Sequence, residues 1–255
     1  METSKGPGTW MFGVAIAVVA AIAVGAYLWM HRAPPPAPPP VAQEAPPPPA
    51  DAPLPPAEQS DASLRGKGIA LSPRPELSKW LEQPGILERW AVVTDNLAED
   101  VSPRKQLGFL APAGQFKVEQ MSGRSFIDPR SYARYDTFAD VVASVDAKAF
   151  ATLVRDLHGI IEAAYHALGY PGRKLDVTAA QALQRLMSAP VLAGPVEVKP
   201  GRGALYAYAD PKLEHAGEVE KHLLRMGPRN THLIQAKARE IAQALDLPMS
   251  AARIP

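Results

Sequence analysis

Residues 146–169 read DAKAFATLVRDLHGIIEAAYHALG, and the spacing of their apolar residues decides the fold class. Apolar side chains recur at steps of three and four along the whole stretch, as they do on the buried face of an α-helix. Lys148, Arg155 and Glu162 keep to the opposite side. Asp146 is suited to cap the start of a helix and Gly169 to end it. The sequence therefore predicts one long amphipathic helix over these residues.

Further helices are predicted on both sides of this stretch, because prolines and aspartates at their starts alternate with glycines and prolines at their ends. The expected helices are a short one after Ser72 that ends at Pro84-Gly85, one over Ile86–Leu97, a short one from Asp128-Pro129, one from Asp176 to Pro190, one from Asp210-Pro211 to Gly227, and a last one from Pro228 through Leu245.

Two segments alternate as strands do. Phe116 to Met121 and Arg124 to Asp128 flank Ser122-Gly123, which is typical of a β-hairpin, and residues 191–208 predict a second short hairpin or extended pair. The expected soluble domain is therefore mainly α with one or two small β-hairpins, an α+β fold.

The amino-terminal part has a different character. Residues 10–30 read WMFGVAIAVVAAIAVGAYLWM, an uncharged run about as long as the ~20 residues that a membrane-spanning helix needs. A cleaved signal peptide is the alternative, but aromatic residues near both ends favour a retained single transmembrane helix. Since a short stub such as residues 1–9 usually stays in the cytoplasm, we expect the rest of the chain on the far side.

A proline-rich segment follows. Residues 33–56 hold thirteen prolines and two charged residues, Glu44 and Asp51. Such a composition cannot build a core, so it predicts a disordered linker with polyproline II character that reaches on the order of 75 Å at ~3.1 Å per residue. A ligand for a proline-reading module is the alternative reading. The expected organisation is a stub at 1–9, the transmembrane helix at 10–30, the linker at 31–72 with a poorly patterned lead-in from 57, the soluble domain at 73–247 and a tail at 248–255.

Composition excludes several classes of function. The chain has no cysteine, which rules out disulfides, thiolate metal sites and thiol nucleophiles. Its formal net charge is +1 without blocks of basic residues, so no nucleic-acid partner is expected.

Six spaced motifs resemble one bacterial family. They are RWAVVTDNL at 89–97, FIDPRSYARYD at 126–136, AAYHALGY at 163–170, GPVEV at 194–198, YADPKLE at 208–214 and LLRMGPRN at 223–230. In this order they are similar to the family catalogued as domain of unknown function 3014 (DUF3014), over roughly residues 74–245. The resemblance implies a membrane anchor, a proline-rich linker and this domain, and it implies no activity. The chain departs from the family pattern at Val154, His158, Gly159 and Ala216-Gly217.

Arginines, tyrosines and aspartates are concentrated in these motifs. Guanidinium groups bind carboxylates or phosphates in a bidentate way, and tyrosines add a rigid surface with a hydroxyl. A buried network of hydrogen bonds and ion pairs is the competing explanation. The candidate binding residues are Asp128, Arg130, Tyr132, Arg134, Tyr135, Asp136, Tyr165, Asp210, Arg225 and Asn230.

Other motifs carry weaker signals. His158, Glu162 and His166, and likewise His215, Glu218 and His222, could each share a helix face, but we interpret both trios as solvated stripes and expect no metal and no cofactor. Ser102-Pro-Arg-Lys105 has the spacing of a Ser-x-x-Lys nucleophile motif without its other elements, and we interpret it as chance.

These observations favour a binding or scaffold module over an enzyme. We expect a single-pass protein of the bacterial inner membrane whose domain lies in the periplasm and binds another envelope protein or peptidoglycan, with the lipid bilayer contacted through residues 10–30. The rival hypothesis is an acid/base hydrolase of cell-wall material that uses two carboxylates among Asp128, Asp136 and Asp210.

Overall fold

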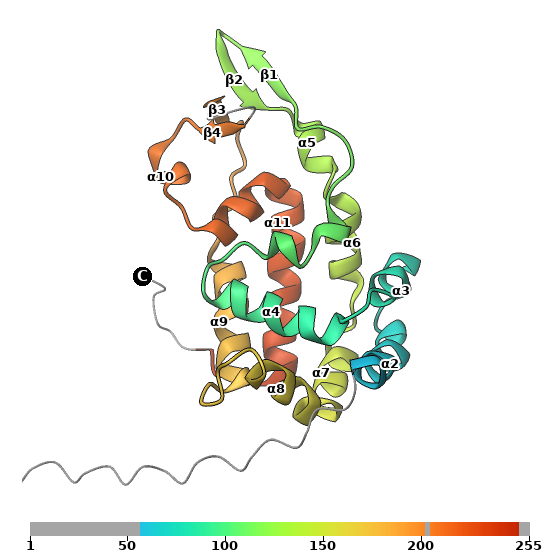
Figure 1. Cartoon of the computed structure of the whole chain (residues 1–255). Coiled ribbons are helices and arrows are strands. Elements are labelled where there is room, and N and C mark those ends of the chain that lie inside the picture. The colour runs from blue at the N-terminus through green and yellow to red at the C-terminus, as the bar shows by residue number, and fades with distance from the viewer. Residues whose placement is uncertain (1–56, 202–204, 250–255) are drawn as a thin grey trace, which may run out of the picture. The chain divides into compact units, whose positions relative to one another are not determined.

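A computed structural model describes residues 57–201 and 205–249 of the chain (Figure 1). This part is mainly helical and carries one small antiparallel sheet, which confirms the predicted α+β class. The predicted transmembrane segment at 10–30 and the proline-rich segment at 33–56 lie outside the described residues.

Helices make up most of the domain. The α-helices are α2 (Ala57–Gly68), α3 (Pro75–Leu81), α4 (Ile86–Ala98), α5 (Pro129–Ala133), α6 (Asp136–Ser144), α7 (Ala147–Asp156), α8 (His158–His166), α9 (Leu175–Ser188), α10 (Pro211–Glu214) and α11 (Glu218–Leu245). Three short 3₁₀ helices are η1 (Ile69–Leu71), η2 (Pro103–Lys105) and η3 (Gly108–Leu110). The strands are β1 (Val118–Met121), β2 (Arg124–Ile127), β3 (Glu197–Pro200) and β4 (Tyr206–Tyr208).

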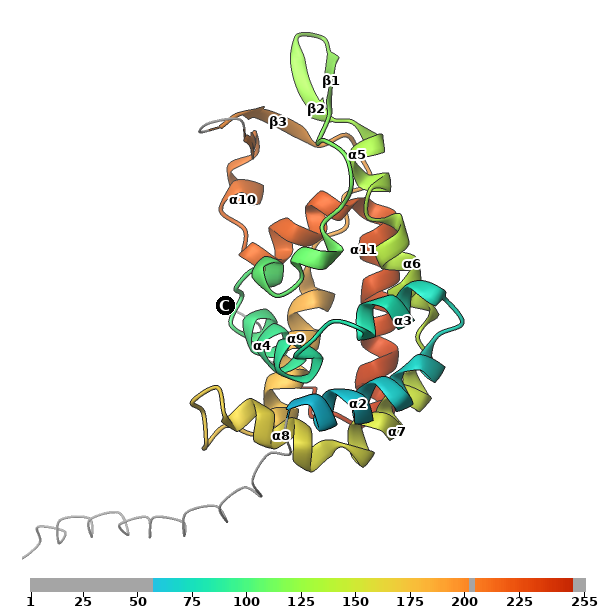
Figure 2. The same ribbon diagram turned by 45° about the vertical axis from the view of Figure 1, so that its right-hand side comes forward.

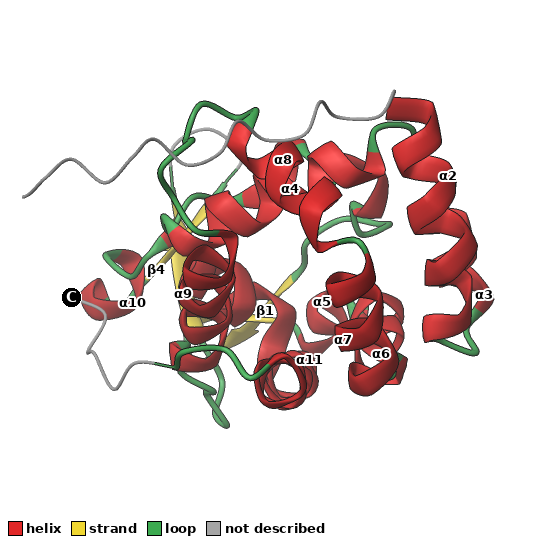
Figure 3. Cartoon of the chain, turned by 90° about the horizontal axis from the view of Figure 1, so that it is seen from below, coloured by secondary structure: helices red, strands yellow, loops and turns green. Residues whose placement is uncertain are grey.

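Helix α11 is the element around which the other helices pack. It contacts α5, α6, α7 and α9, and Figure 3 shows it nearly end-on between α9 and the pair α6 and α7. Its buried side chains, among them Val219, Leu223 and Ile234, form an apolar cluster with residues of α6 and α9. A second cluster, centred on Ile161 and Tyr165, lies between α4, α7, α8 and α9.

A sharp break divides α11 at Gly227. This residue has φ 81° and ψ 169°, a conformation that is accessible essentially to glycine alone. Pro228 follows and lacks a backbone N–H, so it can begin a new helical segment without leaving a donor unpaired. The predicted end of one helix at Gly227 and start of the next at Pro228 are thereby confirmed in the backbone.

The long helix predicted over residues 146–169 is two helices, and the single-helix prediction was wrong. Leu157, with φ −104° and ψ 7°, ends α7, and α8 begins at the next residue. Leu153, Leu157 and Ile161 nevertheless all reach the same apolar cluster. Two consecutive helices that meet at Leu157 and pack against the same core therefore produce the apolar periodicity of a single helix.

The lead-in at 57–72 is also folded, contrary to the prediction of an unpatterned linker. Residues 57–68 form α2, and the Asp61 carboxylate accepts hydrogen bonds from the backbone N–H groups of Gly85, at 2.7 Å, and Leu87, at 3.3 Å. Because Gly85 begins α4 and has no side chain to cap it, Asp61 acts as the cap from outside. The folded domain therefore starts before residue 73.

Both predicted hairpins are present, and they join into one sheet. Its strand order is β1-β2-β3-β4 with every pair antiparallel, and Ser125 of β2 is paired with Val198 of β3. Figure 2 shows the β1–β2 hairpin projecting beyond the helices.

Aspartates cap helices as predicted at three positions, and a fourth does not act as a cap. Asp146 accepts hydrogen bonds from the backbone N–H groups of Lys148 and Ala149 at the start of α7. Asp128 and Asp210 accept hydrogen bonds from the first-turn N–H groups of α5 and α10. Asp176, in contrast, lies inside α9, which begins at Leu175. The helix predicted from Asp210 to Gly227 is interrupted after α10, and α11 starts where Val219 N–H donates to the Asp100 carboxylate at 3.0 Å.

Within residues 57–201 and 205–249, no helix has both the length and the apolar character required to cross a bilayer. The 28 residues of α11 are long enough, but charged side chains interrupt them.

Candidate functional site

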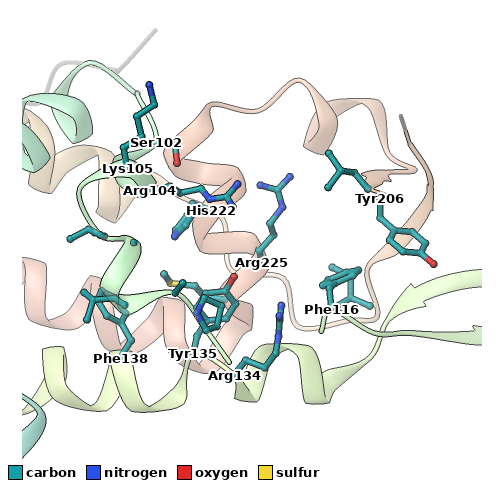
Figure 4. A pocket seen from close by; sticks show the side chains of 18 of the residues that line it. Ser102, Arg104, Lys105, Phe116, Arg134, Tyr135, Phe138, Tyr206, His222 and Arg225 are labelled. Atoms are coloured by element: carbon teal, nitrogen blue, oxygen red, sulfur yellow. The ribbon is translucent and has the colours of Figure 1, made fainter. Parts of the chain in front are cut away.

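A pocket of about 930 Å³ lies where four parts of the domain meet (Figure 4). One wall is the loop that carries η2 and η3 after α4, and a second is the sheet. The start of α6 forms a third wall, and the α11 segment before Gly227 contributes His222, Arg225 and Met226. The break at Gly227 therefore sets the direction of the segment that bears these three side chains.

The pocket is lined by cations without acids. Arg104, Lys105, Arg134 and Arg225 line it, whereas no aspartate or glutamate does so among the residues that the structure describes. None of these four side chains has a carboxylate within 4.0 Å in the described part of the chain. Their charge is therefore available to a bound anion.

Two of the arginines are held against aromatic rings. The Arg225 guanidinium lies 5.9 Å from the centre of the Tyr208 ring, and that of Arg134 lies 5.9 Å from the Phe116 ring. Arg134 also donates to the backbone oxygens of Ser131 and Gly114. Stacking on a ring orients a guanidinium while leaving its in-plane N–H donors exposed.

His222 lies near two of these cations, Arg104 and Arg225. Its ring contacts Tyr135 edge-on, with 6.4 Å between ring centres. Burial, together with the nearby charges of Arg225 and Arg104, lowers the pKa of His222 to about 4. The imidazole is therefore neutral at pH 7, and the interpretation of His222 as part of a solvated stripe was wrong.

The rest of the lining is largely apolar or aromatic. Phe116 and Tyr206 contact each other across the sheet wall, with 5.6 Å between ring centres, and Tyr206 is 39% exposed. Tyr208 is buried, which raises the pKa of its hydroxyl to about 12 and keeps it neutral. Leu107, Leu110 and Phe138 extend the apolar part on the side of η3 and α6. The pocket thus combines a cationic part with a hydrophobic part.

Of the ten candidate binding residues, the structure brings Arg134, Tyr135 and Arg225 together in this pocket. The other seven lie elsewhere. Tyr165 is buried in the cluster between α8 and α9, where its hydroxyl lies 3.0 Å from the Thr178 hydroxyl and donates to Asp95 at 3.2 Å.

Three of the remaining candidates, Asp128, Arg130 and Asp210, take part in hydrogen bonds at the starts of helices. The Asp128 carboxylate accepts from the backbone N–H of Arg130 at 2.9 Å and from its guanidinium Nε at 2.9 Å. These hydrogen bonds from Arg130 lower the pKa of Asp128. Asp210 accepts from the backbone N–H of Lys212 at 2.8 Å.

The last three candidates, Tyr132, Asp136 and Asn230, stabilise the break in α11. The buried Asn230 side chain donates to the backbone oxygen of Tyr132 at 3.1 Å and to the Asp136 carboxylate at 2.9 Å. Tyr132 packs against Gly227, so these residues tie α5 and α6 to α11 beside the pocket.

The carboxylates proposed for acid/base chemistry are therefore engaged in the scaffold. Asp128, Asp136 and Asp210 have the partners just given, and none of them lines the pocket. No group of three potential metal ligands occurs among residues 57–201 and 205–249. Ser102 and Lys105 do line the pocket, but the Ser102 hydroxyl is buried without a hydrogen-bond partner in the described structure, so no Ser–Lys dyad forms.

Several lining residues were missed in the sequence. Arg104 and Lys105 lie in a loop between prolines, and Phe116 and Tyr206 come from two hairpins whose pairing no local pattern shows. A signal for His222 was present in the motif that follows it, because residues 223–230 contain the Gly-Pro break that turns this helix segment toward the pocket.

Comparison with known proteins places the chain in a family. Residues 86–242 match the model of the family described as protein of unknown function (DUF3014). The chain belongs to this family. The DUF3014 match begins at α4 and ends within α11, so it includes every element that lines the pocket. No curated protein and no solved structure matches the chain.

Proposed function

We propose that this DUF3014 protein is a membrane-tethered binding module of the bacterial cell envelope, which uses the pocket to hold a negatively charged ligand with an apolar or aromatic body. The ligand belongs to another envelope protein or to cell-wall material. Residues 10–30 anchor the chain in the inner membrane, and the proline-rich segment carries the domain into the periplasm.

The observation that supports this proposal is the set of four cations in a pocket whose lining, among the described residues, includes no acidic residue. A guanidinium that faces a partly desolvated space without a counter-ion is costly, and an anion recovers that cost by accepting its hydrogen bonds. Arg225 is the strongest member of the set, since it is half-buried and its position is fixed by Tyr208. The apolar lining gives such a ligand a second source of affinity.

The amino-terminal sequence supports the location. An uncharged run of 21 residues at 10–30 matches the thickness of the hydrocarbon layer, and thirteen prolines in 33–56 suit a spacer. A binding module placed at a distance from its own membrane is suited to a ligand that is fixed elsewhere in the envelope.

The test uses the full chain in a non-ionic detergent and the fluorescent trianion 8-methoxypyrene-1,3,6-trisulfonate, a flat aromatic anion whose charge does not change with pH. We expect its fluorescence anisotropy to rise on binding. Arg225→Gln should weaken binding at least tenfold, since a charge-assisted hydrogen bond is worth roughly 1.5–3 kcal/mol. The matched control is Arg124→Gln, which removes another ring-stacked arginine, 5.3 Å from Phe126, outside the pocket. Equal losses in the two variants, or no loss in either, would contradict the proposal.

A further inference from the structure

Two guanidinium groups and one imidazole converge at one end of the pocket. Arg104 comes from η2, whereas His222 and Arg225 lie three residues apart on the first segment of α11. Figure 4 shows the Arg104 and Arg225 side chains directed toward the same open space beside His222. All three side chains line the pocket.

An acidic group, Glu218, lies near this cluster, and its charge acts on both His222 and Arg225. Glu218, one turn before His222 on α11, is 2.9 Å from the Lys221 ammonium, and Tyr135 contributes a neutral ring. Within the described residues, Arg104 and Arg225 make neither an ion pair nor a hydrogen bond with another side chain. Arg104 and Arg225 therefore have no carboxylate within 4.0 Å in the described residues, and Glu218 offsets their charge only in part because it is paired with Lys221.

The chemistry of the cluster selects the kind of anion. A single carboxylate carries one negative charge and satisfies one guanidinium fork. A phosphoryl group carries about −1.5 to −2 at neutral pH and has three strong acceptor oxygens, enough for two guanidinium groups and an imidazole N–H. The neutral state of His222 leaves it one N–H to donate. A dianion thus matches the cluster in both charge and number of acceptors.

We propose that Arg104, His222 and Arg225 form a subsite for the phosphoryl group of the ligand, whose apolar or aromatic body lies toward Phe116 and Tyr206. This inference rests on the proposed function, because it names the chemical class of the ligand for the same pocket. Arg134 lies outside the subsite, since backbone oxygens of Ser131 and Gly114 already accept from its guanidinium.

Competition against the bound pyrene trisulfonate tests the subsite in the full chain. We expect inorganic phosphate and sulfate to displace the probe at concentrations at least tenfold lower than acetate or chloride. Glycerol 3-phosphate, the headgroup portion of a phospholipid, forms a separate arm. Displacement by glycerol 3-phosphate at lower concentration than inorganic phosphate would assign the phosphoryl group to a phosphoester ligand, and the reverse order would assign it to free phosphate.

Variants locate the effect. Arg104→Gln and Arg225→Gln should each raise the phosphate concentration needed for half-displacement of the probe at least tenfold. Arg225→Lys should raise it less than Arg225→Gln, because lysine keeps the positive charge but lacks the bidentate guanidinium donors. Arg124→Gln is the control. His222→Gln keeps a hydrogen-bond donor, so it should weaken phosphate binding less than Arg104→Gln or Arg225→Gln does. Direct calorimetric titration of phosphate into the full chain provides the same comparison without the probe.

The outcomes separate this inference from the proposed function. If the probe binds in an Arg225-dependent way but phosphate competes no better than acetate, the phosphoryl subsite is refuted and the anion pocket stands. If the probe does not depend on Arg225, the proposed function itself falls. Phosphate binding that is unchanged in both Arg104→Gln and Arg225→Gln would refute the assignment of these residues.

Discussion

The ring of Tyr132 lies against the bare Cα of Gly227, so close that a Cβ added to this glycine would come within 2.4 Å of Tyr132 Cγ. The contact joins α5 to the break in α11, and the break directs His222 and Arg225 to the pocket. Glycine is thus required at residue 227 for two independent reasons, its backbone conformation and the absence of space for a side chain.

Gly227→Ala is expected to destabilise the domain by more than about 3 kcal/mol. The strained conformation alone costs an alanine on the order of 1–3 kcal/mol, and the overlap with Tyr132 adds to it. Urea denaturation of the full chain in non-ionic detergent, followed by circular dichroism, measures the effect. The control is Gly159→Ala in α8, where an added Cβ meets nothing within 4 Å and alanine should stabilise by up to about 1 kcal/mol. Similar changes in the free energy of unfolding of Gly227→Ala and Gly159→Ala would contradict this explanation of the glycine at residue 227.

Asp61→Ala should lower the free energy of unfolding by about 1 kcal/mol, the usual value of a helix cap. The change removes the acceptor of the Gly85 and Leu87 N–H groups at the start of α4. Glu58→Ala, at an exposed position of the same helix, is the matched control. If the two variants are equally stable, α2 is not an integral part of the domain and the boundary at residue 73 would be restored.

His222 makes the stability of the domain depend on pH between about 4 and 6.5. Its pKa is about 4 in the folded chain and ~6.5 when unfolded, so in this window the unfolded state binds a proton that the folded state does not. Its contribution is therefore complete above pH 6.5 and is lost as pH falls toward 4, by on the order of 1–3 kcal/mol. The difference in unfolding free energy between wild type and His222→Gln should fall over this range. The exposed His232→Gln on α11 is the control, and a difference independent of pH would refute the prediction.

The proposed topology predicts that alkaline phosphatase fused after residue 249 is active in cells, because this enzyme folds only outside the cytoplasm. The full chain should also resist extraction from membranes by alkaline carbonate, since a spanning helix is held by burial of its apolar side chains. Removal of residues 10–30 is the control for both measurements. An inactive fusion, or a full chain released by carbonate, would refute the assigned location.

Local signals in the sequence predicted most of the helices. Asp128 and Asp210 were identified as caps because the aspartate and the N–H groups that it accepts from are two residues apart. The Ser122-Gly123 turn was identified because this pair separates two alternating segments, and in the structure both residues have the positive φ that a tight hairpin needs. In each case the information lies within a few residues.

Errors arose where separate segments meet. The apolar stripe of residues 146–169 continues through Leu157, so periodicity could not show that the backbone turns there. Asp61 lies 24 residues before its partner Gly85, and a polar stretch without periodicity gave no sign that it would fold. Both features depend on tertiary contacts that outweigh local pattern.

Only some of the pocket residues could be predicted from the sequence, because the position of the others depends on tertiary contacts. Arg134, Tyr135 and Arg225 were chosen for their chemistry, but the residues that complete the pocket come from a loop and from two hairpins. His222 is polar and was predicted to lie on a solvated face, but it lines the pocket together with Arg104 of the loop after α4. Predicting this position of His222 requires knowledge of where the loop after α4 lies relative to α11.

The pairing of β2 with β3 also determines when the pocket can exist during folding. Ser125 and Val198, which are paired across these strands, are 73 residues apart in the chain. Closing so long a loop costs more entropy than forming a local helix, so this contact is expected late in folding. A growing polypeptide would therefore form its earlier helices first and its ligand site last, after synthesis of both β4 and the first segment of α11, which carries His222 and Arg225. Nascent chains that stop before β4 would contain Arg104 and Arg134 but would lack Tyr206, His222 and Arg225.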